Sequence, residues 1–464
     1  MGQIGAVGRR EMFSGAALIV PRHVLGGQGY KAPSDRLNIA GVGIGGNIAR
    51  SHLRGVVEAD GPNNIVALCD VDEAYSVPTY KLWPNARRYR DFRVMLEKEA
   101  KNIDGVYIAT PDHNHAVVAM AALKLRKHVL CVKPLARTVQ ECRALASAAK
   151  AAGTVTQVTA SSRATPSALE LCETIWDGAI GPVREVHAWT DRPIWPQGVG
   201  RPKETPPVPE GLDWDLWLGP APVRPYHPAY LPWIWRGWWD FGTGSLGDMG
   251  CHFFNTMFRA LKLGYPTKVQ AVSTTHFQRP EFDYPTGNKK LVKARLPETA
   301  PASAILTWDF PAREDMPAVR VRWYDGGLKP PVPEELGPEG SLESNGILYV
   351  GDKGKILGGT NDGMIIPKSK AQAYGTPPKK IERLPWDSKY LLQNEWVAAS
   401  KGGKIVPSCN FGVAAHLTEV ALLGNIATRT GKTLEWDTGA GRFKNAPDAD
   451  AYLEAGYRSG WSLG

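Results

Sequence analysis

The sequence predicts an α/β protein with two folded domains, the first on a parallel sheet and the second, an α+β domain, on a large open, mostly antiparallel sheet. Residues 37–152 repeat short apolar runs followed by helix-compatible segments, a pattern typical of parallel strands with right-handed crossovers. From about residue 155, longer runs alternate between apolar and polar residues, as antiparallel strands with one solvated face do. The chain has 464 residues, more than one core usually holds.

The composition is that of a globular protein, with 43% hydrophobic residues and a net charge of +9. The basic residues are dispersed and form no long block, which disfavours nucleic acid as a partner. Outside the N-terminal stretch we find no segment of ~20 apolar residues, so we expect no membrane partner. The six cysteines are far apart and lack the spacing of a zinc site or a disulfide framework. We therefore expect free thiols and no metal site.

Residues 1–34 differ from the rest of the chain. Arg9 and Arg10 precede a short apolar stretch, residues 12–20, in an order that resembles a twin-arginine export leader. The stretch is too short to span a bilayer and no clean A-x-A cleavage site follows, so a surface-packed or disordered N-terminal arm is the competing interpretation. If the segment is an export leader, the protein is expected in the periplasm. If the segment is an N-terminal arm, the protein is expected in the cytoplasm.

A glycine-rich turn follows the first apolar run, in the order strand, tight turn and helix over residues 37–50. Gly41, Gly43 and Gly46 fit G-x-G-x-x-G, in which glycines permit the turn, the approach of a pyrophosphate and close helix packing. Alone, this pattern is weak evidence for a nucleotide site. The cofactor contacts expected from this turn are Gly41, Gly43, Ile44, Gly45 and Gly46.

A carboxylate follows the second predicted strand, residues 65–68. Asp70 lies 24 residues after Gly46, where a Rossmann fold places the acid that binds the ribose hydroxyls, and Asp72 is the rival. Together with the glycines, this spacing predicts a Rossmann dinucleotide-binding domain over residues 35–155.

The remaining elements of the first domain continue the alternation. We predict strands over residues 104–109 and 128–132, and helices over residues 115–125 and 140–152, the last ended by Gly153. Thr110, Pro111 and Lys133 follow strands directly, and ligands gather at the carboxyl ends of parallel strands.

The second domain, residues 156–464, contains a long segment with little periodicity. Its predicted strands are residues 183–190, 268–277, 304–310 and 319–324. Residues 193–239 are rich in Pro and Trp and predict long loops, which are usually functional or interfacial. Trp233, Trp235, Trp238 and Trp239 lie within seven positions. An indole face can stack on a sugar ring, although burial is the commoner fate of a tryptophan.

Five motifs carry a family resemblance. They are GVGIGG, ATPDHNH at residues 109–115, VKPLA at residues 132–136, GDMGCH at residues 247–252, and the tail from Asn394 through LTEVALLGN to GKTLEWD. On these the chain resembles the Gfo/Idh/MocA oxidoreductases, the glucose-fructose oxidoreductase and inositol dehydrogenase family, over roughly residues 36–464. The resemblance implies a Rossmann domain, a second domain that often mediates oligomers, and a nicotinamide cofactor between them. We expect a homo-oligomer, dimer or tetramer, whose helix at about residues 411–430 packs on the first domain.

The resemblance also implies a cofactor and a catalytic set. We expect NAD rather than NADP, because Asp70 would repel a 2′-phosphate and no arginine pair follows it. The further cofactor contacts expected are Thr110, Pro111, His115 and Lys133.

Lys133 matches the lysine of the family's EKP motif, and Asp248 and His252 match its D-x-x-x-H pair. Residues at i and i+4 of a helix share one face, so the pair could reach one substrate. His252 would act as the base, Lys133 would stabilise the alkoxide, and Asp248 would orient the hydroxyl or His252. The alternatives from the residues alone are a structural His252 and an N-capping Asp248.

Two departures from the family concern the substrate. Val132 replaces the usual glutamate of EKPLA, and residues 159–163, TASSR, replace a segment that often contacts substrate in relatives. We consider Arg163, Trp238 and Trp239 candidate substrate contacts, with a surface ion pair as the alternative for Arg163. The resemblance predicts NAD-dependent oxidation of a secondary hydroxyl of a sugar, glycoside or polyol. The alternatives are redox-neutral glycoside cleavage through transient oxidation, and a module that binds nucleotide without catalysis.

Overall fold

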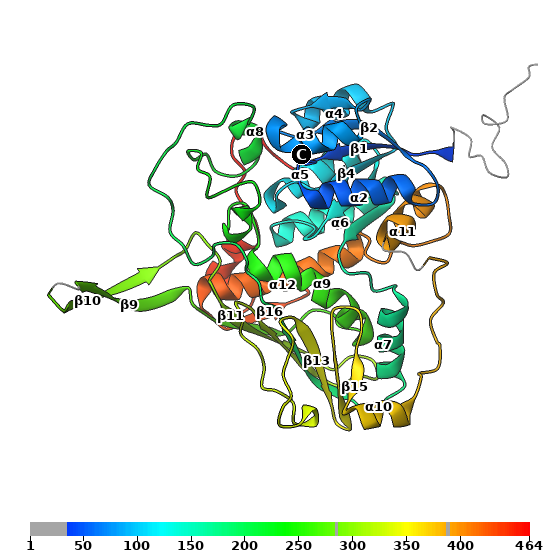
Figure 1. Ribbon diagram of the computed structural model, residues 1–464, viewed down its shortest axis with the longest axis vertical. Helices are drawn as coiled ribbons and strands as arrows, with labels where there is room; N and C mark the ends of the chain where they lie inside the picture. Colours follow the sequence, from blue (N-terminus) through cyan, green and yellow to red (C-terminus); the bar gives the residue numbers. More distant parts are fainter. Residues whose placement is uncertain (1–34, 284–285, 387–389) are drawn as a thin grey trace, which may run out of the picture. The chain divides into compact units, whose positions relative to one another are not determined.

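The computed structural model describes residues 35–283, 286–386 and 390–464. The twin-arginine leader expected in residues 1–34 lies outside the described residues. Residues 37–464 form one compact unit that contains two sheets with their helices (Figure 1). This arrangement confirms the predicted fold class, a parallel-sheet Rossmann domain followed by a domain with a mixed, mostly antiparallel sheet.

The first sheet has six parallel strands in the order β3-β2-β1-β4-β5-β6. The strands are β1 (Asn38–Val42), β2 (Asn64–Cys69), β3 (Arg87–Tyr89), β4 (Gly105–Ile108), β5 (His128–Val132) and β6 (Thr156–Thr159). The strand order reverses between β1 and β4, and doubly wound sheets bind ligands at such a switch point. The boundary expected at residue 155 would assign β6 to the second domain, whereas β6 pairs with β5 in the first sheet.

Helices connect these strands. They are α2 (Asn47–Glu58), α3 (Glu73–Leu82), α4 (Phe92–Glu99), α5 (Asp112–Lys124) and α6 (Val139–Ala152). A capping box between Thr138 and Glu141 starts α6, and Gly153, with φ of 64°, ends it as predicted. Gly43 has φ of 75°, and a Cβ on it would lie 2.5 Å from the backbone nitrogen of Thr110. The turn after β1 therefore requires glycine at this position.

The second sheet has nine strands in the order β15-β14-β13-β7-β12-β11-β8-β16-β17. The strands are β7 (Val183–Trp189), β8 (Lys268–Ser273), β11 (Ala304–Phe310), β12 (Val319–Tyr324), β13 (Gly346–Gly351), β14 (Gly354–Gly358), β15 (Met364–Ile366), β16 (Leu434–Asp437) and β17 (Arg442–Phe443). Only the pair β7 and β12 is parallel among the described strands of this sheet.

A separate hairpin corrects one strand prediction. The strand expected over residues 268–277 ends at Ser273 in β8, and β9 (His276–Asp283) pairs instead with β10 (Asn288–Arg295). The hairpin extends away from the nine-stranded sheet (Figure 1). The turn between β8 and β9 breaks the alternation that the sequence suggested to be continuous.

Residues 193–239 are mostly irregular, as predicted, with a short helix α8 (Trp214–Leu218) and a 3-10 helix η2 (Ile234–Gly237). Their aromatic side chains, among them Trp217 and Trp238, pack on one another and on Phe241 in a small separate core. This core is separate from those of the two large sheets. Its packing holds the segment in place despite the lack of regular structure.

The remaining helices follow β6 in the chain. They are α7 (Pro166–Trp176), α9 (Gly244–Ala260), α10 (Lys368–Tyr374), α11 (Leu391–Ser400) and α12 (Phe411–Thr430), with 3-10 turns η3 (Glu334–Leu336) and η4 (Pro447–Tyr452). Helix α12 contacts α6 and β6 of the first domain, and α9 and β8 of the second. By length and composition α12 could cross a membrane, but it is largely buried, as the core helix of a globular protein is. All six cysteines are buried and free, as expected.

Candidate active site

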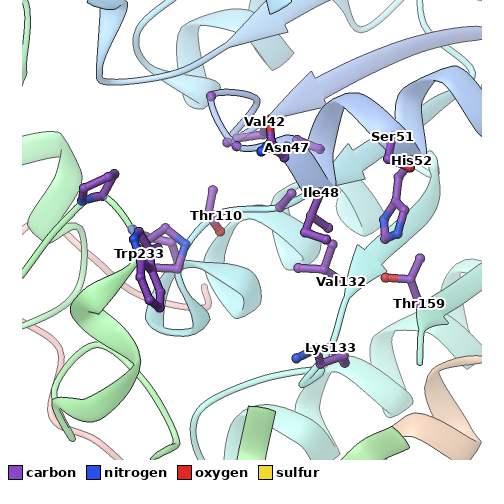
Figure 2. A pocket seen from close by; sticks show the side chains of 18 of the residues that line it. Val42, Asn47, Ile48, Ser51, His52, Thr110, Val132, Lys133, Thr159 and Trp233 are labelled. Carbon is purple, nitrogen blue, oxygen red and sulfur yellow. The ribbon is translucent and has the colours of Figure 1, made fainter. Parts of the chain in front are cut away.

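A cavity of about 980 Å³ opens at the carboxyl ends of the first sheet's strands. Figure 2 shows Thr110, Val132 and Lys133 on the side of the first domain, with Trp233 across the open space. The other predicted residues that line it are Gly43, Gly45, Gly46, Asp70, Pro111, Asp248 and His252. The volume lies at the upper end of the usual range for ligand pockets, ~300–1,000 Å³.

The end of the cavity beside β2 fits a dinucleotide. Asp70 accepts hydrogen bonds from the backbone N–H groups of Gly45, at 2.8 Å, and Asp72, at 3.0 Å. Burial raises the pKa of Asp70 to about 6, and these two hydrogen bonds oppose the rise. The carboxylate of Asp72 instead caps α3 by accepting from the N–H of Tyr75. Of the two carboxylates, Asp70 is thus the one that contacts the glycine turn, which admits no side chain at Gly43.

Three expected cofactor contacts lie behind the cavity wall. Gly41 packs on Ile44 and Leu68, so that a Cβ on it would lie 2.8 Å from Cγ2 of Ile44. Ile44 is itself fully buried. His115 is also buried, with its ring nitrogens 2.8 Å from the carbonyl oxygens of Thr110 and Pro134. Gly41, Ile44 and His115 therefore do not line this cavity, and they support the loops that do.

Lys133 and Asp248 form the polar centre of the site. Nζ of Lys133, at the end of β5, lies 2.6 Å from Oδ1 and 2.5 Å from the carbonyl oxygen of Asp248 on α9. Nε of Arg236 lies 3.1 Å from the same Oδ1. Burial raises the pKa of Asp248, but Lys133 and Arg236 more than offset it and hold the pKa at about 2. Asp248 is therefore ionised and holds two cations.

His252 lies one helical turn after Asp248, as the sequence predicted for an i, i+4 pair. Its Nδ1 lies 3.0 Å from Oγ of Ser161, and that hydroxyl donates to Oγ1 of Thr360 at 3.2 Å. Because the hydrogen of Ser161 is used on Thr360, the Ser161 oxygen accepts from Nδ1–H of His252. This assignment leaves a lone pair on Nε2.

The electrostatic surroundings keep His252 neutral. Burial, and then the charge of Lys133, lower the pKa of His252 to about 3, against the opposing effect of Asp248. At neutral pH the ring is thus an uncharged proton acceptor. Its hydrogen-bond partner Ser161 follows β6 in the segment that departs from the family pattern.

Sequence reasoning did not identify several residues of this site. Arg236 contacts Asp248, and Ser161 contacts His252. Thr360 contacts Ser161, and none of the three lies in a motif of the family. Arg236 lies within the cluster of tryptophans just before α9, and this cluster is the sequence feature that could have identified it. Val132 lines the cavity beside Lys133, and Asp248 supplies the carboxylate partner of that lysine where the sequence lacks the family's glutamate.

The structure does not bring the three candidate substrate contacts to the cavity. Trp238 is 1% exposed and donates to the carbonyl of Ala229, and Trp239 is 8% exposed. Arg163 is neither a lining residue nor part of an ion pair among the described residues, and burial lowers its pKa. None of the three lines this cavity, and Trp238 packs instead in the aromatic core.

Two neighbouring tryptophans line the cavity instead. Trp233 is 42% exposed and meets Trp195 edge to face, with ring centroids 6.3 Å apart. Trp235 packs under the guanidinium of Arg236, whose Cζ is 4.3 Å from the ring centroid. The Trp-rich segment thus presents an exposed indole and a cation to the same space.

Together, a doubly wound sheet, a glycine turn with its carboxylate, and a Lys–Asp–His cluster define a two-domain dinucleotide-binding protein with an acid–base site. The chain belongs to the Gfo/Idh/MocA oxidoreductases. The family's NAD-binding Rossmann fold matches residues 37–160, and its C-terminal alpha/beta domain matches residues 189–276.

Known proteins of the family match part of the sequence. Over 91 residues the chain is 43% identical to levoglucosan dehydrogenase of Pseudarthrobacter phenanthrenivorans, covering 20% of this chain and 23% of that protein. Over 136 residues it is 33% identical to D-apiose dehydrogenase of Paraburkholderia graminis, covering 29% and 36%. Over 154 residues it is 29% identical to inositol 2-dehydrogenase of Salmonella typhimurium, covering 33% and 44%. The matches thus span less than half the length of each relative.

Solved structures match the fold over more of the chain. Aldose-aldose oxidoreductase from Caulobacter crescentus, complexed with glycerol, aligns with a TM-score of 0.55 at 20% identity, covering 86% of this chain and all of that one. The WlbA dehydrogenase from Bordetella pertussis, in complex with NADH and UDP-GlcNAcA, aligns with a TM-score of 0.58 at 16% identity, covering 87% and 99%. At these identities the likeness shows the two-domain fold.

Proposed function

We propose that the protein oxidises a secondary hydroxyl of a sugar, glycoside or polyol with NAD as the hydride acceptor. The observation that carries the proposal is the Lys133–Asp248 ion pair, one helical turn from a neutral His252, in the cavity that also contains the glycine turn and Asp70. The named relatives are dehydrogenases of sugars and polyols, which supports the same substrate class.

The residues at the nucleotide end favour NAD over NADP. The backbone at Gly43, Gly45 and Gly46 lines the cavity where a pyrophosphate can approach the start of α2. The carboxylate of Asp70 accepts hydrogen bonds from ribose hydroxyls and repels a 2′-phosphate. Arg90, a lining cation that could attract such a phosphate, is paired with Glu73 at 2.7 Å.

The catalytic residues have two different roles: one accepts the proton of the hydroxyl, and the other stabilises the negative charge on its oxygen. Bound NAD supplies the acceptor for the hydride that leaves the carbinol carbon. Nε2 of His252 takes the proton of the hydroxyl, and Nζ of Lys133 stabilises the negative charge that develops on its oxygen. Asp248 holds Lys133 by a short ion pair, and Arg236 donates to the same Oδ1 of Asp248. Ser161 keeps His252 in the tautomer whose Nε2 is free.

The cavity wall across from Lys133 suits a sugar ring. Trp233 offers an exposed indole face there, and indoles stack on the apolar C–H faces of sugars. Backing by Trp195 limits the movement of this indole. A polyol or sugar could thus be held by its apolar face while its hydroxyl points to Lys133 and His252.

Product analysis tests the proposal and separates it from redox-neutral cleavage. Purified protein is incubated with NAD and with levoglucosan, D-apiose, inositol or an aryl glycoside, and NADH and products are followed by absorbance and mass spectrometry. Oxidation predicts NADH and a keto product in equal amounts. Release of the aglycone without net NADH would identify transient oxidation instead. If no compound of a broad sugar and polyol panel is oxidised or cleaved, the proposal is wrong.

A further inference from the structure

A second cavity, of about 250 Å³, lies between the start of α6, the segment before α9, and the end of α12. It shares no lining residue with the first cavity. Its walls include Arg137, Trp239, Arg429 and Tyr452. Because it is smaller than the ~300–1,000 Å³ typical of organic ligands, it suits an ion or a small charged group.

Two guanidinium groups in this cavity lack anionic partners. Cζ of Arg429 lies 4.3 Å from the ring centroid of Tyr452 and 5.4 Å from that of Trp239. Across the described part of the chain, we find no hydrogen bond or ion pair of its side chain. Among the described residues, the side chain of Arg137 donates once, from Nη1 to the carbonyl oxygen of Trp239 at 3.2 Å, and its buried Nε has no partner. Each guanidinium has five N–H donors, so most of the donors are unused.

The acids nearby do not neutralise these cations. Asp240 lines the cavity, but its carboxylate is bound to Arg224, which is itself buried. Glu454 also lines it and has an exposed side chain without an ion pair among the residues described. Burial lowers the pKa of Arg429, Arg137 lowers it further, and the charges of Tyr452 and Asp240 offset only part of this shift. Arg137 and Arg429 are both partly buried and line one cavity, where their charges repel each other, and an anion bound between them would offset that repulsion.

We propose that this cavity binds a small oxyanion, a phosphate group or a carboxylate, between Arg137 and Arg429. The planar fork of arginine matches both groups through paired N–H···O bonds, and stacking against Trp239 and Tyr452 restricts the guanidinium of Arg429. Arg137 lies four residues after Lys133, and Thr243, another lining residue, immediately precedes α9. The anion would therefore lie beside the segment that follows Lys133 and beside the start of α9, the helix that carries Asp248 and His252.

Calorimetric titration of inorganic phosphate into the NADH-saturated protein tests the proposal. Saturation with NADH keeps phosphate out of the glycine turn of the first cavity, which also attracts pyrophosphate oxygens. We expect one phosphate per chain. Arg429→Met and Arg137→Met should each weaken its binding roughly tenfold or more, because each removes one side of the clamp. Arg429→Lys, which keeps the charge without the fork, should fall between Arg429→Met and wild type.

The matched control is Arg184→Met, which removes an exposed arginine whose partner, Asp352, lies outside both cavities. It should bind phosphate as wild type does. Circular dichroism and NADH affinity establish that each variant is folded, and Arg137→Met carries the test if Arg429→Met does not fold. Parallel titrations with glycerol phosphate and citrate distinguish a free ion from a phosphate monoester or a carboxylate ligand. Absence of binding by all three anions to wild type, or equal binding by wild type and both methionine variants, would overturn the proposal.

Discussion

Nζ of Lys133 and Oδ1 of Asp248 lie 2.6 Å apart, although 115 positions separate them in the sequence and they belong to different domains. The contact joins the end of β5 to α9 and fixes the charge state of Asp248, whose pKa lies at about 2. It also leaves His252, one turn along the same helix, as the neutral group of the cluster.

The first prediction concerns Ser161, which fixes the tautomer of His252 by accepting from Nδ1–H. Ser161→Ala removes this acceptor, so turnover should fall by roughly 10-fold or more with little change in the KM for NAD. Ser161→Thr retains a hydroxyl and should restore part of the loss. Steady-state kinetics measure both. Ser167→Ala, at an exposed position, is the control, and equal turnover of Ser161→Ala and this control would rule out the role of Ser161.

The second prediction concerns the pH dependence of catalysis. A base must be unprotonated, and burial together with the charge of Lys133 lowers the pKa of His252 to about 3, so the neutral form persists well below the usual value of 6.5. The acid limb of kcat/KM for the sugar, measured with saturating NAD, should therefore have its midpoint well below pH 6. A midpoint near 6.5 that disappears in His252→Ala would show that the ring is more exposed to water than its burial indicates.

The third prediction concerns NAD affinity, which depends on the charge of Asp70. Burial raises the pKa of this carboxyl to about 6. Because the ionised form accepts ribose hydrogen bonds, NAD should bind more weakly as the pH falls below about 6. Asp70→Asn should remove this dependence and narrow the preference for NAD over NADP. Fluorescence titration of both cofactors measures the effect, and tighter binding of NADP by wild type would contradict the assignment.

The fourth prediction concerns Trp233, the exposed indole on the cavity wall. Trp233→Ala should raise the KM for the sugar several-fold and leave NAD binding and the melting temperature near their wild-type values, since 42% of the side chain is already exposed. Trp238→Ala is the contrasting variant. It should lower the melting temperature instead, because that indole is buried in the aromatic core, where truncation costs about 3–5 kcal/mol. Unchanged sugar kinetics in Trp233→Ala would exclude the stacking role.

The sequence predicted the elements that obey local rules. The turn at Gly43 needs a backbone without a side chain, Gly153 ends a helix in the left-handed conformation, and Asp248 and His252 share a helical face; each is a short-range consequence of residue type and spacing. The parallel first sheet and the mostly antiparallel second sheet followed from apolar periodicity in the same way, whereas the strand order came only from the structure.

Tertiary packing determines which of the candidate side chains line the cavity, and this could not be predicted from the sequence. Four tryptophans within seven positions have similar local contexts, but the irregular segment buries Trp238 and Trp239 and turns Trp233 to the cavity. Ser161 and Thr360 meet across the site from distant loops, and no spacing rule relates them. His115 has a motif position that suggests ligand contact, yet its ring bridges two backbone carbonyl groups behind the wall. Such residues are identified only when the whole fold is known.

The most direct test of the proposed mechanism is single-turnover NADH formation by Lys133→Met and His252→Ala on a sugar or polyol that wild type oxidises. Each variant should lose ~10²- to 10⁴-fold in rate, because both side chains act on the hydroxyl of the substrate. The affinity of each variant for NADH should stay within a few-fold of wild type, because neither side chain holds the pyrophosphate. Lys98→Met, at an exposed position of α4, should react at the wild-type rate. Near wild-type rates in either catalytic variant would contradict the assignment of that residue to the reaction.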